Sequence, residues 1–412
     1  LNQRLDTPFI KYNGKFEKAS WDEVYKIIKS KFENTSKEKV SGFVGDLTNM
    51  ETAYIFKEFF NRTLDSQNYE SRSDNRFTDI SKRENYLFNS TINGIEESDL
   101  ILLIGTNPRY EATILNARIR KSYLNNNTKI ISLSELGDLT YPYESLDGQT
   151  QTLKNIFDGN HDVSKTILAA SKPLVIIGES LLKSSSSRYL FNKIKRFMSQ
   201  NKKNNDEWKS LNILSCDAST VGNFDLGLVN ENNNLLEDLQ KNKFDIVYLV
   251  GQDNLNFKKN DEFVIYQGSH GDKGAEVADI ILPGSAYTEQ DGYFTNLEGK
   301  LQKAYKASYP PGEAKEDWQI INELAEIMNN RKLFNDKEEL ESSMLNHLSL
   351  QKEKQDSNSD SNIEIDEKEF KNETLEVNVK DYYFSNVIAR SSITMIECNN
   401  SKINLKFTGT EG

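Results

Sequence analysis

Cysteine and histidine are scarce in this sequence. Cys216 and Cys398 are the two thiols, and three histidines accompany them among 412 residues. A disulfide framework needs more cysteines, and a single iron-sulfur cluster is normally held by about four thiolates. We therefore expect that this chain alone holds no cluster, and we interpret each cysteine as a small, buried apolar residue.

Two further features are missing, namely an excess of basic residues and a long apolar segment. The formal net charge is -12 at pH 7, whereas a surface for nucleic acid or anionic lipid needs clustered Lys and Arg. The strongest apolar runs, at 100–104 and 244–250, have the length of strands and fall short of the roughly 20 residues that cross a bilayer. We expect no nucleic-acid partner and no direct membrane insertion.

The apolar residues that are present occur in short runs separated by helical patterns. The runs are LILLIG at 100–105, KIISL at 129–133, PLVIIGES at 173–180, FDIVYLVG at 244–251 and FVIYQG at 263–268. Continuous apolar runs of this length are typical of parallel strands buried on both faces. The sequence therefore predicts an α/β fold of several domains, with Rossmann-like, mostly parallel sheets flanked by helices.

Local signals place several helices and turns. Asn13-Gly14 predicts a hairpin turn, and Ser20 with Glu23 forms a capping box that opens a helix. Asn107 is a good N-cap for a helix that runs to about Tyr123, and 318–328 has the spacing of an amphipathic helix.

We divide the chain into four parts. They are a first α/β portion with an N-terminal hairpin and helix at 1–150, a second α/β portion at 151–335, a charged flexible linker at 336–380, and a C-terminal segment at 381–412 that returns to the body. The linker is rich in charge, Ser and Asn and poor in apolar residues, which predicts a solvated segment.

Four blocks resemble the large iron-sulfur subunit of respiratory complex I. They are GTNPRYEATILNARIRKSYL at 105–124, GSHGDKGAEVADIILPGSAYTEQDGYFTNLEGKLQ at 268–302, PPGEAKEDWQIINELAEI at 310–327 and YFSNVIARSSITMIEC at 383–398. The resemblance implies the molybdopterin-oxidoreductase-like, C-terminal part of that subunit. In the family, this part follows a ferredoxin-like portion that holds the clusters, and no residues here match it. The resemblance therefore predicts a split subunit or a fragment.

The resemblance implies a non-catalytic structural role in the peripheral, NADH-oxidising arm of complex I. Electron transfer from NADH to ubiquinone would be carried by neighbouring chains, with no cofactor in this chain and with iron-sulfur clusters and FMN in partner subunits. The expected partners are other complex I subunits, especially the cluster-bearing part of the same subunit and the flavin-bearing subunit. The expected location is the matrix side of the mitochondrial inner membrane, and Asn-rich runs such as NENNN at 230 indicate the coding bias of an organelle genome.

Three local patterns invite a ligand. The turn from Gly105 to Arg109 joins a strand to a helix and could cradle a phosphate, and in molybdenum-containing relatives such a turn lies near the pterin. It lacks the GxGxxG pattern, so we interpret it as a turn that satisfies its own helix-end donors. His270 and Asp272 lie among glycines at 268–274, but two ligands are too few for zinc, and a hydrogen-bonded loop is favoured.

The third pattern is the block at 278–300, whose ADIILP and NLEGK segments resemble what the family writes as ADVVLP and NxEGR. Its candidate residues are Glu289, Asn296, Glu298, Gly299 and Lys300. Lys300 stands where the family usually has Arg, which replaces a two-pronged planar donor by a point charge. We interpret the block as a structural turn that buries Glu298. We assign no catalytic, cofactor-binding or metal-binding residue in this chain.

Some choices stay open at this stage. Tyr293, Phe294, Tyr305 and Tyr309 could anchor an interface or pack in the core. An active molybdopterin-dependent oxidoreductase domain is the alternative function. A nucleotide-binding dehydrogenase is excluded, because no strand-to-helix turn carries the glycine fingerprint with an acidic residue about 20 positions later.

Overall fold

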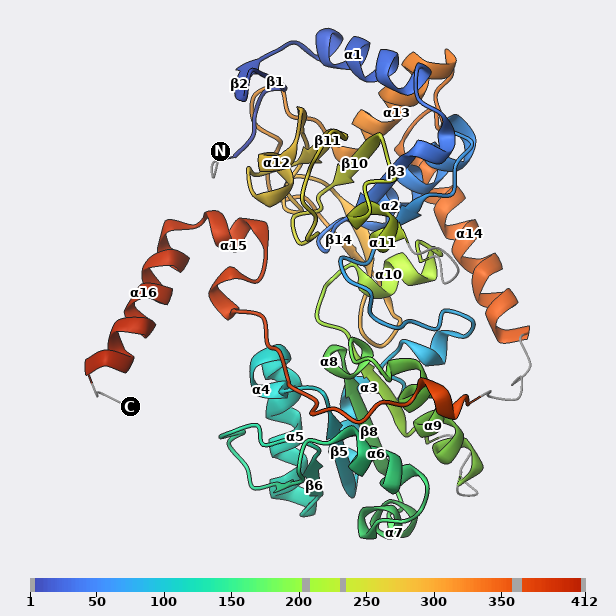
Figure 1. Ribbon diagram of the computed structural model, residues 1–412, viewed down its shortest axis with the longest axis vertical. Coiled ribbons are helices and arrows are strands. Elements are labelled where there is room, and N and C mark those ends of the chain that lie inside the picture. The colour runs from blue at the N-terminus through green and yellow to red at the C-terminus, as the bar shows by residue number, and fades with distance from the viewer. Residues whose placement is uncertain (1–3, 202–207, 230–234, 358–364, 409–412) are drawn as a thin grey trace.

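The chain folds into two lobes, one above the other in Figure 1, each built on its own sheet. The structure is a computed structural model that describes residues 4–201, 208–229, 235–357 and 365–408. We call the lobe with the seven-stranded sheet the upper lobe and the lobe with the five-stranded sheet the lower lobe.

The upper sheet has the strand order β2-β1-β12-β11-β10-β3-β4. Its strands are β1 (Phe9–Tyr12), β2 (Lys15–Lys18), β3 (Val40–Val44), β4 (Tyr69–Glu70), β10 (Ile246–Val250), β11 (Phe263–Gly268) and β12 (Ile280–Pro283). The five strands from β12 to β4 are parallel, while β1 pairs antiparallel with both β12 and β2. The predicted hairpin thus adds an antiparallel edge to a parallel sheet.

The lower sheet has the order β7-β6-β5-β8-β9, and all its pairs are parallel. Its strands are β5 (Leu100–Ile104), β6 (Lys129–Ser132), β7 (Glu144–Ser145), β8 (Pro173–Gly178) and β9 (Leu211–Leu214). The first strand in sequence lies in the middle, so the chain winds outward first on one side and then on the other. This is the doubly wound arrangement of dinucleotide-binding folds, and it agrees with the predicted α/β class.

The helices cover the faces of the two sheets, except for the last two, which lie in a C-terminal arm (Figure 1). They are α1 (Trp21–Glu33), α2 (Met50–Glu58), α3 (Thr91–Gly94), α4 (Pro108–Glu111), α5 (Thr113–Asn126), α6 (Thr150–Phe157), α7 (Asp162–Ala169), α8 (Glu179–Leu182), α9 (Ser187–Gln200), α10 (Thr220–Asp225), α11 (Leu235–Gln240), α12 (Lys273–Val277), α13 (Asp317–Asn329), α14 (Lys337–Ser357), α15 (Val387–Ser391) and α16 (Ile393–Thr408). A separate hairpin consists of β13 (Gly292–Thr295) and β14 (Leu301–Ala304). No helix in the described ranges is long and apolar enough to cross a membrane.

The strands are apolar on both sides because each side faces a core. In β10, Ile246 and Tyr248 pack with α1, α2 and α13 on one face, while Val247 and Leu249 pack with α11 and α12 on the other. The lower sheet likewise separates a core under α6, α7 and α9 from a core under α5. Burial on both faces explains why these strands read as continuous apolar runs rather than as alternating ones.

The two lobes do not follow the expected boundary at residue 150. Within the lower sheet, β5 and β8 pair along their length, from Leu100 with Pro173 to Ile104 with Ile177. A division at 150 would separate these paired strands. The upper sheet takes its strands from both 9–70 and 246–283, so the chain passes from the upper lobe to the lower one and back.

The segment expected to be a flexible linker is largely built into the fold. Residues 337–357 form helix α14, in which Leu340, Met344 and Leu348 are buried against the upper lobe. These three residues recur every four positions and supply an apolar stripe that the charged composition hid. Residues 365–380 then run as an extended strap over the lower lobe (Figure 1), where Leu375 joins its core. The part of the linker at 358–364 lies outside the described residues.

The helix stripe yields a direct test. We expect Leu340→Ala to lower the free energy of unfolding by about 2–5 kcal/mol, because it opens a cavity where the side chain has no exposed surface. Leu350→Ala, on the same helix but with a residue that is 65% exposed, should change it by less than about 0.5 kcal/mol. Urea denaturation measures both values, and equal effects would contradict the packing of α14 on the body.

Candidate functional site

The carboxyl ends of strands from both sheets meet at the junction between the lobes. Asp46 follows β3 of the upper sheet, and Asp217 follows β9 of the lower sheet. Both carboxylates contact Lys380, at 3.6 Å and 2.7 Å from its Nζ. Open α/β sheets bind ligands beyond the carboxyl ends of their strands, at the point where the strand order reverses. The lobe junction is therefore the candidate site.

The reversal point lies between β5 and β8 in the lower sheet and between β3 and β10 in the upper sheet. Gly105 and Gly178 end the first pair of strands, and a Cβ at Gly178 would lie 2.4 Å from the Gly105 carbonyl oxygen. In the upper sheet, a Cβ at Gly45 would lie 1.7 Å from the Gly251 carbonyl oxygen. In both sheets, these glycines follow the last paired residues of neighbouring strands, and their backbones approach closely.

The turn after β5 uses its own donors. The Glu111 carboxylate accepts from the Asn107 amide and from the Thr106 hydroxyl, both at 2.6 Å. The Asn107 side chain accepts from the Arg109 amide at 3.2 Å. The Arg109 guanidinium turns away to Asp138, 2.6 Å from its carboxylate. The Thr106 hydroxyl and the amides of Asn107 and Arg109 thus have partners within the chain.

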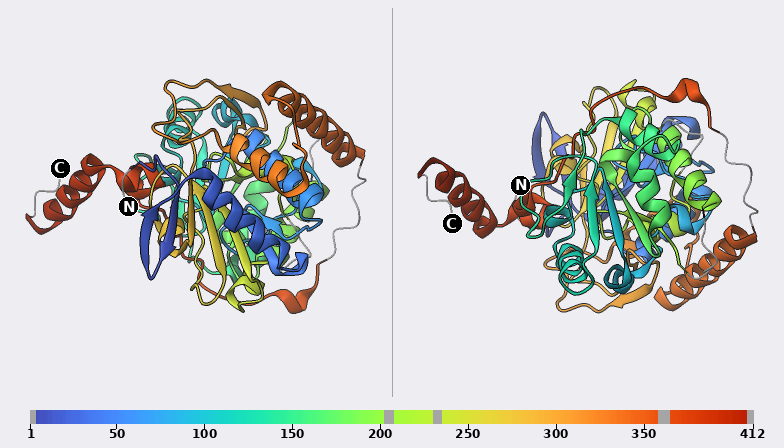
Figure 2. Two further views of the ribbon diagram at one scale, coloured as in Figure 1. Left: turned by 90° about the horizontal axis from the view of Figure 1, so that it is seen from above. Right: turned by 90° about the horizontal axis from the view of Figure 1, so that it is seen from below.

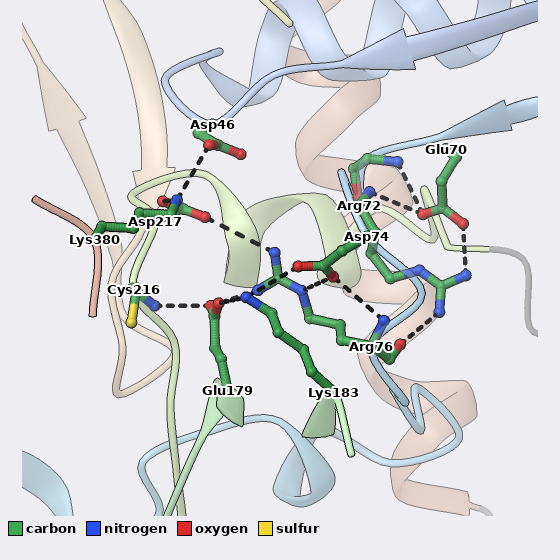
Figure 3. A network of polar contacts seen from close by, with 11 residues as sticks. Asp46, Glu70, Arg72, Asp74, Arg76, Glu179, Lys183, Cys216, Asp217 and Lys380 are labelled. Atoms are coloured by element: carbon green, nitrogen blue, oxygen red, sulfur yellow. Dashed lines mark hydrogen bonds and ion pairs between the residues drawn. The ribbon is translucent and has the colours of Figure 1, made fainter. Parts of the chain in front are cut away.

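Arg76 is the hub of an ion network that fills the junction (Figure 3). Its guanidinium donates from Nε to Asp74 at 2.7 Å, pairs with Glu179, and lies 4.0 Å from Asp217. Lys183 closes one side, 3.0 Å from Asp74 and 3.3 Å from Glu179. Although burial alone would raise it, Arg76 and Lys183 hold the pKa of Glu179 below its ordinary value.

Lys380, at the end of the strap, is the second cation that connects carboxylates at the junction. It joins Asp46 to Asp217 across the lobes (Figure 3). One oxygen of Asp217 has no hydrogen-bond partner among the described residues. Burial and the nearby Asp46 raise the pKa of Asp217, so the protonated form of this carboxyl is favoured more than it is in water.

Cys216 lies at the edge of the same network. Its amide donates to Glu179 at 3.1 Å, and its thiol lies 3.6 Å from a Glu111 carboxylate oxygen. Burial, then Glu179 and Glu111, raises the pKa of the Cys216 thiol. A metal ligand or nucleophile needs the thiolate, and this environment opposes it. The Cys216 thiol therefore acts as a small, half-buried packed group. The expectation that Cys398 is buried is wrong, because this residue is exposed on α16.

Two hollows among the described residues lie near the junction or on the lower lobe. A cavity of about 20 Å³ lies beside Arg76, Glu179 and Tyr86, which is room for about one water molecule. A larger cleft of about 420 Å³ opens on the lower lobe between 134–136 and 374–377. Its charged lining residues are Glu135, Asp147 and Glu376, which repel a phosphate-bearing cofactor. No group of three or more His, Cys, Asp or Glu in the described ranges could hold a metal ion.

The loop at 268–274 is built into the structure by hydrogen bonds. His270 bonds its neighbour Ser269 at 2.9 Å through Nδ1, and burial lowers its pKa. Asp272 pairs with Arg390 at 2.5 Å. Asp253 holds the loop from beneath, because it accepts from the Gly274 amide at 3.1 Å. His270 and Asp272 thus have separate partners, which agrees with a hydrogen-bonded loop.

The NLEGK block forms the turn between β13 and β14. Asn296 accepts from the Glu298 and Lys300 amides at 3.1 Å and 2.9 Å, and Gly299 has a φ of +79°. Glu298 accepts from the Ile92 amide at 2.6 Å and pairs with Lys300 at 2.7 Å. Glu298 therefore lies in the turn of the β13–β14 hairpin, and its bond to the Ile92 amide connects this hairpin to the lower lobe.

The other candidates of the two blocks separate into structural and surface residues. Glu289 accepts from Arg4 Nε at 3.1 Å and from the Ala286 amide at 2.9 Å. Tyr293 and Phe294 are half-buried. Tyr305 and Tyr309 are each 75% exposed, so these two do not pack in the core.

Comparison with known proteins identifies the protein family of this chain. Residues 4–327 match the molybdopterin oxidoreductase family, and residues 339–398 match the C-terminal model of the NADH-ubiquinone oxidoreductase G subunit. The chain belongs to the molybdopterin oxidoreductase family. The fold class read from the sequence is confirmed.

Individual relatives of this chain are subunits of NADH-ubiquinone oxidoreductase. The chain is 34% identical to the NADH-ubiquinone oxidoreductase 75 kDa subunit of Reclinomonas americana, over 96% of this chain and 60% of that protein. It is 36% identical to the mitochondrial NADH-ubiquinone oxidoreductase 78 kDa subunit of Candida albicans, over 96% and 56%. The resemblance to the large complex I subunit is confirmed, and the chain spans less than two thirds of the length of these relatives.

Solved structures show the same fold at low identity. Acetylene hydratase from Pelobacter acetylenicus superimposes with a TM-score of 0.54 at 13% identity, over 79% of this chain and 61% of that one. The formyltransferase/hydrolase complex from Methylorubrum extorquens gives 0.55 at 12% identity, over 78% and 99%. These likenesses concern the fold alone.

The glycine contacts can be tested by adding one methyl group. We expect Gly178→Ala to lower the free energy of unfolding by about 1–3 kcal/mol, because the new Cβ would lie 2.4 Å from backbone. Gly94→Ala is the matched control, since its Cβ would have no neighbour closer than 3.5 Å and Ala favours a helix. Thermal or urea unfolding gives both values, and a tolerated Gly178→Ala would mean that the turns can part.

Asp253 gives the folded chain a pH dependence. Burial raises its pKa from 3.8 to about 7, so the folded chain binds this proton more tightly than the unfolded chain does. The stabilisation from this group is complete below about pH 4 and is lost as the pH rises through 7.

We expect Asp253→Asn to reduce the fall in the free energy of unfolding between pH 5 and pH 8. The reduction is about 1.4 kcal/mol for each pKa unit of the shift that this window covers. Asp65→Asn, at a side chain that is 83% exposed, serves as the control. Identical pH profiles for the parent and both variants would show that Asp253 does not titrate with the raised pKa.

Proposed function

We propose that the chain is a non-catalytic structural subunit, or part of one, in the peripheral arm of respiratory complex I. Its function is to hold neighbouring chains that carry electrons from NADH to ubiquinone. The observation that carries the proposal is the ion network at the junction, where Arg76 and Lys380 pair with carboxylates that follow strands of both lobes. The assignment to complex I is supported by two relatives that are 34–36% identical to this chain and are subunits of NADH-ubiquinone oxidoreductase.

The same observation weighs against an active molybdopterin-dependent oxidoreductase. A cofactor at the junction would have to displace Arg76 and Lys380, which pair with carboxylates from both lobes. Removing the Arg76 guanidinium, whose side chain is 7% exposed, leaves buried carboxylates without a counter-charge, at a cost of about 3–5 kcal/mol. We infer no cofactor in this chain, with the clusters and FMN carried by partners.

The proposal also covers the chain's surroundings. The expected partners are the cluster-bearing N-terminal part of the large complex I subunit and the flavin-bearing subunit, because the relatives are themselves subunits of NADH-ubiquinone oxidoreductase. The expected place is the matrix side of the inner membrane, since the relative from Candida albicans is a mitochondrial protein.

Affinity purification of the tagged full chain from its source tests the proposal. We expect iron-sulfur and flavin-bearing chains to copurify in equal molar amounts. The chain produced alone should contain less than about 0.1 mol of iron, molybdenum or flavin per mol, because the residues that the structure describes include no group of metal ligands. Recovery of the chain without those partners, or stoichiometric metal in the chain alone, would overturn the proposal.

A further inference from the structure

The C-terminal residues 381–408 form an arm that stands away from both lobes (Figures 1 and 2). The arm contains the short helix Tyr382–Phe384, α15 and α16. The sequence led us to expect that this segment returns to the body and packs there. Instead, its contacts with itself are the more extensive ones, and α16 points outward.

Local hydrogen bonds shape the arm. Asp381, Asn386 and Ser392 each cap the helical turn that follows them, by accepting from the Tyr383, Ala389 and Met395 amides. The Arg390 guanidinium donates to the Phe384 carbonyl at 3.1 Å and so closes the bend. The arm therefore has a defined shape even where the body does not support it.

The arm exposes apolar surface that water does not favour. Ile393 is 74% exposed, Tyr382 is 64% exposed and Ile396 is 37% exposed. A helix pair of this length is marginal in water without packing. Ile393 and Ile396 lie three positions apart, so they are neighbours on α16, and exposed apolar neighbours on one helix suit a binding site. The arm thus has the character of an element that is completed by a partner.

The base of the arm shows where that partner lies. Arg390 pairs with Asp272, at the end of the loop that follows β11. The same loop receives Arg4, which donates to the Ser269 carbonyl at 2.9 Å and pairs with His270 as a β-bridge. Figure 2 shows the first described residues beside the arm in both views. One loop therefore fixes both Arg4 and the arm.

Residue 4 is also where the match to the molybdopterin oxidoreductase family begins. Residues 339–398 match the C-terminal model of the large complex I subunit, and the relative from Reclinomonas americana extends well beyond the 60% of its length that this chain spans. The remaining length of that relative lies outside the part that this chain spans. Arg4, where the family match begins, contacts the same loop as the arm.

We propose that residues 381–402 of the arm, with the loop at 268–272, bind the portion of the large complex I subunit that precedes the family match. The binding is the same whether that portion is a separate polypeptide or continuous with this one. The proposal rests on the proposed function, because it takes the partner from complex I. The exposed Ile393 and Ile396 supply the apolar anchor, and Arg390–Asp272 fixes the angle of the arm.

Cys398 provides a probe on α16, because it is exposed whereas burial and carboxylates raise the pKa of the Cys216 thiol. In the purified native complex, we expect Cys398 to react with a maleimide at least tenfold more slowly than in the chain alone. When the chain is labelled at Cys398 with a benzophenone maleimide and then assembled, cross-links should reach the preceding portion of the large subunit. Mass spectrometry identifies the partner peptide.

Substitution of the anchor gives an independent measurement. We expect the double variant Ile393→Glu, Ile396→Glu to weaken binding of a recombinant preceding portion at least tenfold. Ile114→Glu is the matched control, because Ile114 is 75% exposed on α5 of the lower lobe, and it should change binding less than twofold. Circular dichroism confirms that both variants are folded.

The outcomes separate this proposal from the proposed function. If the chain copurifies with complex I but Cys398 stays reactive, or cross-links to a second copy or to another subunit, the proposal for the arm is wrong and the function stands. Equal weakening by both variants would also overturn it. If no complex I chain copurifies, the proposed function fails first.

Discussion

The rest of the structure depends on the close approach of two backbone turns at the reversal point of each sheet. Gly178 meets Gly105 in the lower lobe, and Gly45 meets Gly251 in the upper lobe. A doubly wound sheet normally holds its ligand beyond such points. In this chain, the carboxylates that follow the strands come together there, and cations from other segments balance their charge.

The resulting network joins parts of the chain that are far apart in sequence. Arg76 comes from the first crossing between the lobes, while Lys380 comes from the end of the strap, and together they contact Glu179, Asp217 and Asp46. Buried ion networks contribute less to stability than their number suggests, because desolvation offsets their attraction. Such networks constrain geometry instead, because a partner that is misplaced leaves a charge unpaired. The network thus fixes the angle between the lobes.

Local patterns in the sequence identified much of the fold. The run at 100–105 corresponds to β5, the run at 263–268 is β11, and Ser20 with Glu23 forms the capping box that opens α1. The division into lobes was beyond such patterns, because β10 pairs with β3 about 200 positions earlier and no local signal records that pairing. Helix α14 was missed because a stripe of single apolar residues is outweighed by its charged composition.

The junction was also missed, although the sequence contained a signal for it. Asp46, Glu179 and Asp217 each come within three residues of the end of a buried strand, and parallel strands present such residues at one edge. The cations could not be found in the same way, because Arg76 and Lys380 lie in segments without a regular pattern. Strand ends predict where charges gather, whereas the partners depend on the tertiary path of the chain.

The interrupted path of the upper lobe has a consequence for biosynthesis. All five strands of the lower sheet lie between residues 100 and 214. In contrast, β3 can pair with β10, through Val40 and Ile246, only after residue 246 has been synthesised. Because domains fold as the ribosome releases them, the lower lobe completes its sheet while the first 70 residues still lack their neighbours. Those residues, including the apolar β3, are then the part of the nascent chain most in need of chaperone protection.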